Sequence, residues 1–424
     1  MNAQTLLYGK KQLALELPAG WQSTEIRAPA VAPAPDALAL VNAALDQPLG
    51  GRGLEDFRGV SSACIAVNDK TRPVPHAVLL PPLLARLEDL GLQPEQISLA
   101  IATGTHPAMV ASEFEKILPP AIIQRYPVFS HDANDLTSMR LCGETARQTP
   151  IWINSRYLDA ELRIVVGDIE PHQFQGFSGG VKSAAIGLAG RATIEPNHAL
   201  MTHPNSRLGE YENNPARQEV EEIGRQIGIH FALNAILNQH KELVSVLAGD
   251  PQAVMLAGIP LARRICQVQV AAPFDLVIAS AGGYPKDINL YQAQKSLAHA
   301  AMIVRPGGAL ILVAACPEGT GSRSYEAWMA EGVSSFTDVF ARFEREGFRV
   351  GPHKAWQIAR DASRVFTVLV SEMDPDFVRS LLLTPAAHLE QAFALIAPRL
   401  PAAPQVGVLP FANNTIPLLE SQPA

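Results

Sequence analysis

The sequence predicts an α/β protein of two domains, each with a mostly parallel sheet flanked by helices. Short apolar runs typical of buried strands alternate with longer segments of helical periodicity, and this alternation is the pattern of parallel sheets. The chain has 424 residues, more than one hydrophobic core usually spans. We therefore expect an N-terminal domain over residues 1–267 and a C-terminal domain over residues 268–424.

The apolar runs place the elements in order along the chain. The alternating leucines of YGKKQLALELP predict an opening strand or hairpin, and the Pro- and Ala-rich residues 23–36 predict a surface connection. VSSACIAVND, ISLAIAT and ELRIVVGD predict buried strands, and a helix is expected from about Met109. FDLVIAS and ALILVAAC predict strands on either side of a helix, LYQAQKSLAHAAMIV. We expect the tail from about residue 405 to pack back on the first domain.

Composition excludes several classes of function. The net charge is -7, so the chain lacks the basic field that holds a nucleic-acid backbone. No apolar run approaches the ~20 residues that span a bilayer, and the N-terminus lacks a signal-peptide pattern. The four cysteines form no C-x-x-C pair and fit a reducing compartment. We expect a cytoplasmic enzyme without a nucleic-acid or membrane partner.

Chemically unusual residues follow the predicted strands. Asp69 and Arg72 lie in NDKTRPVPH, and His106 lies in ATGTHPAM. Ligands bind outside the carboxyl ends of strands in open α/β sheets, so we expect these loops to face one crevice between the two domains. Each pattern also has a plain explanation, namely a surface Asp–Arg pair and a histidine that hydrogen-bonds its own loop.

The stretch GDIEPHQFQGFSGGVKS holds a lysine in a glycine-rich turn. It departs from the nucleoside-triphosphate P-loop, because Val181 stands where that pattern requires glycine before the lysine. Ser178, Gly179 and Gly180 still offer backbone donors to an anion. Lys182 falls in the first turn of a small, apolar helix, where desolvation lowers a lysine's pKa and makes the amine a nucleophile. The alternative is a lysine that reaches into solvent.

Further polar residues are weaker signals by themselves. His172 and His198 flank this lysine, but their spacing matches neither H-E-x-x-H nor a zinc finger. In NLYQAQKSLAHA, Tyr291, Gln292 and Lys295 share one helical face that suits a carboxylate or phosphate. The alternative is an ordinary amphipathic helix. GTGSRS, from Gly319 to Ser324, is only an incomplete dinucleotide-binding pattern.

Taken together, DKTRP, ATGTH, EPHQFQGFSGGVKS, NHALM and YQAQK, in that order, resemble the nickel-dependent lactate racemase family, and Trp356 in KAWQ matches a tryptophan of the same site. The resemblance implies that Lys182 carries a nickel-pincer nucleotide, pyridinium-3-thioamide-5-thiocarboxylic acid mononucleotide, loaded with the help of cofactor-biosynthesis proteins. It implies that His198 binds the nickel and that His106 and His172 are the acid/base pair. Arg72 and Lys295 would hold the substrate carboxylate. The supporting residues would be Asp69, Tyr291, Gln292 and Trp356, with Ser178, Gly179 and Gly180 at the cofactor phosphate.

The implied reaction is racemisation or epimerisation of a small 2-hydroxy acid. Its α-hydrogen is too weakly acidic for a tuned histidine to remove, so hydride transfer to a cofactor replaces deprotonation. Pro107 stands where many members of the family have arginine, which leaves the substrate's size open. The alternatives are an NAD-linked 2-hydroxy-acid dehydrogenase and a non-catalytic nucleotide- or metal-binding module.

Overall fold

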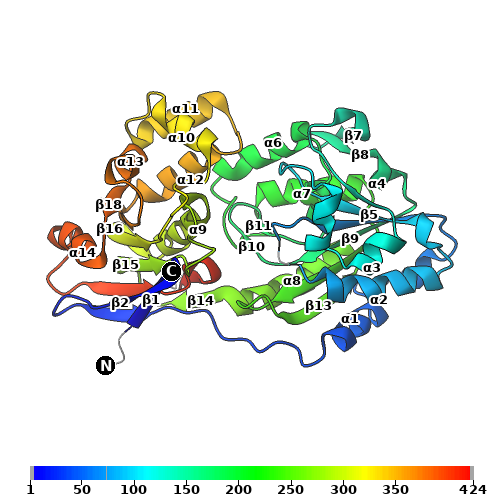
Figure 1. The fold of residues 1–424 in the computed structure, drawn as a ribbon, viewed down its shortest axis with the longest axis horizontal. Helices are drawn as coiled ribbons and strands as arrows, with labels where there is room; N and C mark the ends of the chain where they lie inside the picture. Colours follow the sequence, from blue (N-terminus) through cyan, green and yellow to red (C-terminus); the bar gives the residue numbers. More distant parts are fainter. Residues whose placement is uncertain (1–3, 73, 421–424) are drawn as a thin grey trace. The chain divides into compact units, whose positions relative to one another are not determined.

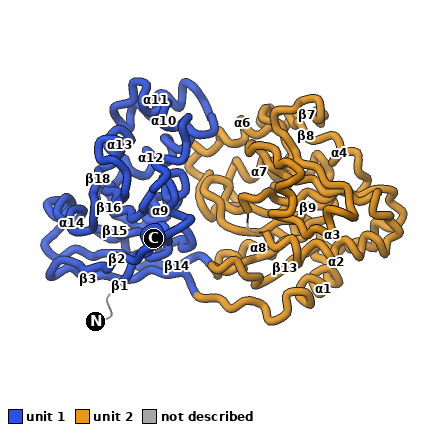
Figure 2. Tube along the Cα trace, in the orientation of Figure 1, with its two compact units in different colours: residues 1–29, 266–424 blue, residues 30–265 orange. Residues whose placement is uncertain are grey.

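The computed structural model describes residues 4–72 and 74–420. Within them the chain forms two compact units (Figure 2). Unit 2 spans Ala30–Ile265, and unit 1 combines the segment that ends at Pro29 with the segment that begins at Cys266. The structure therefore differs from the expected division at the N-terminus, because the segment up to Pro29 belongs with the C-terminal part of the chain.

Unit 2 is built on a six-stranded sheet in the order β13-β12-β9-β4-β5-β6 (Figure 1). Its strands are β4 (Ala63–Asn68), β5 (Ile97–Ala102), β6 (Val128–Ser130), β9 (Leu162–Asp168), β12 (Phe231–Leu237) and β13 (Leu243–Gly249). Neighbouring strands are parallel, except that β12 and β13 pair antiparallel. The three buried strands predicted for this part of the chain are confirmed as β4, β5 and β9.

Helices cover both faces of this sheet, which is why its strands are apolar on both sides. Ile65 and Val67 of β4 belong to one core cluster, which also takes in α1 (Ala37–Asp46) and α2 (His76–Asp89). Cys64 and Ala66 point to the other face and pack in a second cluster. That cluster includes residues of α5 (Lys182–Ala185), α7 (Pro215–Gln226) and α8 (Pro251–Cys266). The remaining helices of unit 2 are α3 (Pro120–Arg125), α4 (Ser155–Asp159) and α6 (Arg191–Ala199).

Small side chains line the sheet where α5 packs. Cys64, Ala66 and Ala100 are fully buried on this face, and Ala184 of α5 is fully buried with them. Small residues on both sides let the helix approach β4 and β9 closely. The start of α5, at Lys182, is therefore held close to the ends of these strands.

Two short hairpins complete unit 2. One is β7 (Met139–Glu144) with β8 (Pro150–Asn154), and the other is β10 (Pro171–His172) with β11 (Gly176–Phe177). Gly176 has a φ of 70°, and a Cβ added there would lie 1.7 Å from the carbonyl oxygen of Glu210. Only glycine fits at this point, so the turn that carries His172 depends on it.

Unit 1 holds a second six-stranded sheet, in the order β18-β17-β16-β15-β19-β3, with parallel pairing throughout. Its strands are β3 (Gln22–Glu25), β15 (Phe274–Ser280), β16 (Val304–Val313), β17 (Phe366–Val370), β18 (Thr384–Ala386) and β19 (Gln405–Leu409). A hairpin of β1 (Gln4–Tyr8) and β2 (Lys11–Leu15) and a parallel pair of β14 (Gln267–Val270) and β20 (Ile416–Leu419) complete its strands. Its helices are α9 (Leu290–Ala301), α10 (Arg323–Ala330), α11 (Phe336–Glu346), α12 (His353–Ala362), α13 (Pro375–Ser380) and α14 (Leu389–Ile396).

Most of the predicted elements of unit 1 are confirmed, including the opening hairpin and the helix that is now α9.

Three expectations for the whole chain differ from the structure. The segment after Met109 forms a 3₁₀ turn over Ala111–Lys116 rather than an α-helix. Part of the expected connection at residues 23–36 lies in strand β3. The tail was expected to pack on the first domain, but its strand β19 pairs with β15 and β3 and so belongs to the sheet of unit 1.

Among the described residues, no helix combines the length and the apolar character needed to cross a membrane.

We predict that Gly176→Ala lowers the thermal unfolding midpoint more than Gly51→Ala, which serves as its matched control. Gly51 also has a positive φ, of 77°, but a Cβ there meets nothing within 4 Å. Alanine at a left-handed position costs roughly 1–2 kcal/mol, which both variants incur. Gly176→Ala adds an overpacking cost of about 1–3 kcal/mol against Glu210. Equal losses measured by calorimetry would contradict this account.

Candidate active site

Three adjacent strands of unit 2 carry polar residues to one edge of the sheet. Strands β5, β4 and β9 are parallel neighbours, so their carboxyl ends lie together. Asp69 and Arg72 follow β4, His106 follows β5, and His172 and Lys182 follow β9. A pocket of about 110 Å³ is lined by residues from all three loops.

The pocket gathers most of the predicted site residues: Asp69, Arg72, His106, His172, Ser178, Gly179, Lys182 and His198. Tyr291, Gln292 and Lys295 lie on α9, and Trp356 lies on α12, both in unit 1. The substrate-binding roles of Tyr291, Gln292 and Lys295, the cofactor-binding role of Trp356, and a site in the crevice between domains stay predictions.

Asp69 and His106 form a hydrogen-bonded pair across two loops. Nδ1 of His106 lies 2.8 Å from Oδ2 of Asp69, and Thr71 donates to Oδ1 from its backbone N–H and its hydroxyl at 3.1 and 2.6 Å. Burial alone would raise the pKa of Asp69, but the hydrogen bonds from His106 and Thr71 outweigh it and hold the pKa below its usual value. The ionised carboxylate therefore accepts a hydrogen bond from the Nδ1–H of His106, so the lone pair of the neutral ring lies on Nε2.

His172 is held in the opposite tautomer. The backbone N–H of Gln175 donates to its Nδ1 at 3.3 Å, so the neutral ring carries its proton on Nε2. Phe174 packs edge-on against His172, with ring centroids 4.8 Å apart, and against His198, with centroids 5.0 Å apart. The aromatic ring thus sets the positions of two pocket histidines at once.

Lys182 is the first residue of α5, as the sequence predicted, and its side chain lines the pocket. Burial lowers its pKa to about 7, and the positive charges of Arg72 and Arg217 add to this effect. A substantial fraction of the amine is therefore neutral near pH 7. A neutral amine in a partly enclosed pocket is a nucleophile.

The loop before Lys182 is fixed from behind by buried side chains. Arg217, which is 0% exposed, donates to the carbonyl oxygens of Phe177 and Gly179 at 3.0 and 3.1 Å. Oδ1 of Asn234 accepts the N–H of Gly180 at 2.7 Å. The lysine is presented by a loop whose backbone is tied to neighbouring elements.

Ser178, Gly179 and Gly180 are each required by the local packing and hydrogen bonding of the loop. The Ser178 hydroxyl bonds the carbonyl oxygens of Asp168 and Glu170 at 3.0 and 3.2 Å. A Cβ on Gly179 would lie 2.9 Å from the Asp168 carbonyl, and one on Gly180 would lie 2.6 Å from the Met255 side chain. Packing alone therefore requires these glycines, and a role at a cofactor phosphate stays a prediction.

His198 lies on α6 and is kept neutral. Burial, and then the charge of Lys182, lowers the pKa of His198 to about 3. Its Nδ1 lies 3.3 Å from Oδ1 of Asn197. A neutral imidazole in a pocket has the chemistry of a metal ligand.

Two buried acceptors near the pocket have no hydrogen-bond partner among the described residues: Oδ1 of Asn68, which lines the pocket, and Oδ2 of Asp168. Burial, and then the negative charge of Glu170, raises the pKa of Asp168 above its usual value. Orphaned buried acceptors are uncommon, and the one on Asn68 suits a donor on a bound molecule.

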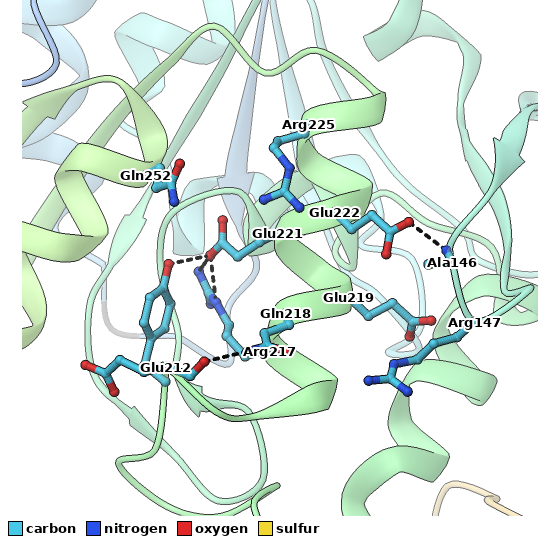
Figure 3. Close-up of a pocket in the computed structure, with 11 residues that line it drawn as sticks. Ala146, Arg147, Glu212, Arg217, Gln218, Glu219, Glu221, Glu222, Arg225 and Gln252 are labelled. Carbon is cyan, nitrogen blue, oxygen red and sulfur yellow. Dashed lines mark hydrogen bonds and ion pairs between the residues drawn. The ribbon is translucent and has the colours of Figure 1, made fainter.

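A larger pocket of about 620 Å³ lies elsewhere in unit 2 (Figure 3). Several of its charged side chains are bonded within the protein, including Glu221 to Arg217 and Tyr211 and Glu222 to the backbone of Ala146. Its lining contains no histidine, cysteine or lysine. We therefore place the candidate chemistry in the smaller pocket.

In unit 1, α9 and α12 pack together. Lys354 of α12 is buried, donates to Gln294 and Gln357 at 3.3 and 2.9 Å, and lies 4.3 Å from the ring centre of Tyr291. Trp356 packs against Phe343, with ring centroids 6.0 Å apart. These contacts fix the helical face that carries Tyr291 and its neighbours.

The incomplete dinucleotide pattern of unit 1 has a packing explanation. Gly321 has a φ of 72°, and a Cβ there would lie 2.4 Å from the Asn289 side chain. Asn289 caps α9, because its Oδ1 accepts the N–H of Gln292 at 3.1 Å. The glycine makes room for this cap.

Sequence reasoning missed the buried residues that support the pocket: Gln175, Asn197, Arg217, Glu219 and Asn234. Asn197 directly precedes His198 and Gln175 lies within EPHQFQGF, so their position was a usable signal. Arg217 and Glu219 lie on α7, far from the quoted stretches, and nothing local distinguishes them from surface charges.

Comparison with known proteins finds relatives that cover most of the chain. The sequence matches the model of the lactate racemase N-terminal domain over residues 8–209 and that of the lactate racemase C-terminal domain over residues 269–412. The lactate racemase of Thermoanaerobacterium thermosaccharolyticum is 29% identical over 363 residues, 84% of each chain. That of Lactiplantibacillus plantarum is 30% identical over 376 residues, 87% of this chain and 88% of the relative.

Solved structures extend the similarity to the fold. The lactate racemase apoprotein from T. thermosaccharolyticum matches with a TM-score of 0.90 and 28% identity, over 97% of this chain and 99% of that one. A protein from Thermotoga maritima shares the fold, with a TM-score of 0.65 and 17% identity over 91% of this chain and 97% of that one. The chain belongs to the lactate racemase family of isomerases.

Proposed function

We propose that this protein racemises or epimerises a small 2-hydroxy acid such as lactate, using a nickel-pincer nucleotide attached to Lys182. The observation that carries the proposal is the convergence, in one pocket of unit 2, of an amine with a lowered pKa and three imidazoles. Similarity to two lactate racemases over most of the chain supports the choice of substrate.

The residues present fit such a cofactor. The described residues contain no group of three or more His, Cys, Asp or Glu side chains able to hold a metal. A metal beside His198 would therefore need most of its ligands from a bound group, as a metal-carrying nucleotide provides. Lys182 offers the attachment point, and the orphaned Oδ1 of Asn68 offers an acceptor to the same molecule.

When bound, this cofactor supplies an electron-poor centre able to accept a hydride. The protein's part is to bind, orient and move protons. Arg72 presents a guanidinium to the pocket, and its planar fork suits the carboxylate of a 2-hydroxy acid. His106 and His172 line the same pocket as Arg72, so a carboxylate bound by Arg72 would place the C2 hydroxyl in the pocket that both imidazoles share.

His106 and His172 are suited to complementary halves of the proton transfer. His106 is oriented by Asp69 with the lone pair on Nε2, so it takes the hydroxyl proton as the substrate is oxidised to the 2-keto acid. His172 points an Nε2–H outward, but it can give up this proton only as an imidazolium, so the ring must first take a second proton on Nδ1 in place of the hydrogen bond from Gln175. In that form it would protonate the carbonyl oxygen when the keto acid is reduced on its other face, and return to the neutral ring. In the reverse direction the two histidines exchange roles, as a racemase requires.

The function is tested by co-expressing the protein with the cofactor-biosynthesis proteins. We expect a mass increase on the Lys182 peptide, about one nickel per chain, and interconversion of D- and L-lactate followed by chiral chromatography. Lys182→Arg keeps the charge but should lack both adduct and activity. An adduct on another residue, or activity in Lys182→Arg, would contradict the proposal.

We predict that Lys182 of the cofactor-free protein is acylated at a lower pH than other lysines. Below pH 7 its amine is protonated and unreactive, and above about pH 7 it is neutral. The pKa of an exposed lysine amine is ordinarily about 10.4. Competitive acetylation with peptide mass spectrometry should give a Lys182 midpoint near pH 7, with Lys11, whose side chain is 76% exposed, as the internal reference. Arg72→Gln should shift the Lys182 midpoint upward. If the acetylation of Lys182 showed the same pH dependence as that of Lys11, this prediction would be wrong.

We predict that His106→Asn and His172→Asn each lower the kcat for racemisation by roughly 100-fold or more, because general acid–base catalysis contributes about 10²–10⁴. Mass spectrometry must show that each variant retains the adduct. His203→Asn is the matched control, since His203 is an exposed histidine of the same unit and should leave the rate unchanged. Full activity in either pocket variant would remove that histidine from the mechanism.

A further inference from the structure

A chain of buried polar side chains leads to His198 from the interior of unit 2. Its first member is Asn197, which is 0% exposed. The Nδ2 group of Asn197 donates to the Ala216 carbonyl and to Oε2 of Glu219, each at 2.9 Å, and its Oδ1 accepts from Nε2 of Gln175 at 2.7 Å. A flipped amide would set its oxygen against a carbonyl and a carboxylate, so its orientation is fixed.

The fixed amide decides the tautomer of His198. Oδ1 of Asn197 lies 3.3 Å from Nδ1 of His198, and an amide oxygen can only accept. Nδ1 must therefore carry the ring proton. A neutral imidazole has one N–H, so its lone pair lies on Nε2.

Glu219 holds the far end of the chain. This carboxylate is 2% exposed, and Oε1 accepts the hydroxyls of Thr145 and Thr149 at 2.8 Å each. Both threonines flank the turn between β7 and β8, and Glu219 projects from α7 (Figure 3). The carboxylate is thus bonded on both oxygens and cannot turn away from Asn197.

We propose that Asn197 and Glu219 are positioning residues that keep His198 in its Nδ1–H tautomer and present the Nε2 lone pair to a metal. This inference rests on the proposed function, in which His198 is the protein's ligand to nickel. Metal-binding histidines commonly donate their second N–H to an oxygen, and loss of that partner costs about 10–100-fold in metal affinity. Here the oxygen is an amide whose orientation is set by a buried carboxylate.

The first test needs no metal. In the cofactor-free protein labelled with ¹⁵N-histidine, long-range ¹H–¹⁵N spectra distinguish the two tautomers, and His198→Gln assigns the signals. We expect His198 to be protonated on Nδ1 in the wild-type protein. Asn197→Ala should shift the population toward the Nε2–H form, and Glu219→Gln should shift it partly. An Nε2–H ring in the wild-type protein would overturn the inference without any variant.

The second test uses protein loaded with cofactor. Nickel release to a chelator, followed by elemental analysis, should be about 10–100-fold faster in Asn197→Ala and intermediate in Glu219→Gln. Glu222→Gln, one helical turn along α7, is the matched control and should release nickel at the wild-type rate. Equal rates in all variants would overturn the inference. A wild-type chain with neither adduct nor nickel would instead contradict the proposed function, and the tautomer measurement separates the two.

Discussion

The rest of the site in unit 2 depends on one buried guanidinium. Arg217 is completely shielded from solvent and bonds the carbonyl oxygens of Phe177 and Gly179 and the carboxylate of Glu221. Removing one partner of a buried ion pair typically costs about 3–5 kcal/mol, because a charge is left uncompensated. Glu221 lies on α7 together with Arg217, so the loop that leads into Lys182 cannot separate from α7 without breaking the two hydrogen bonds from the guanidinium to its carbonyl oxygens. A glycine-rich segment is thus held in place before the lysine by a side chain that does not itself line the smaller pocket.

The electrostatics of the pocket follow from the same arrangement. The positive charges of Arg72 and Arg217 lower the pKa of Lys182 beyond the effect of burial. In the proposed mechanism Arg72 also binds the substrate carboxylate, so one cation serves both the attachment of the cofactor and the orientation of the substrate. The negative charges of Glu170 and Asp168 act on Lys182 in the opposite direction, whereas the Asp69 carboxylate is bonded to His106.

Much of the fold and of the pocket could be predicted from the sequence, because both rest on local patterns. The strands β4, β5 and β9 are continuous apolar runs, and the polar residues follow them directly. The strand β3 was missed because its four residues, QSTE, are all exposed and show no apolar alternation. The helix expected near Met109 failed because the Met109 N–H is bonded to Ser130 at the end of β6, and Val110 is extended. The support of His198 by Glu219 joins positions 21 residues apart, from 198 to 219, through a contact that no local pattern encodes.

Gln175 joins two parts of the site that would otherwise be separate. Its backbone N–H bonds His172, and its side-chain amide bonds Asn197, which in turn bonds His198. The histidine proposed to move protons and the histidine proposed to bind metal therefore share one anchor. Mutations that reshape the turn around His172 to accept a different acid would therefore also disturb the hydrogen bonds that orient His198, the proposed metal ligand. Directed evolution of substrate range in this scaffold should accordingly meet strong epistasis between the two elements, and compensating changes are most usefully sought around Gln175.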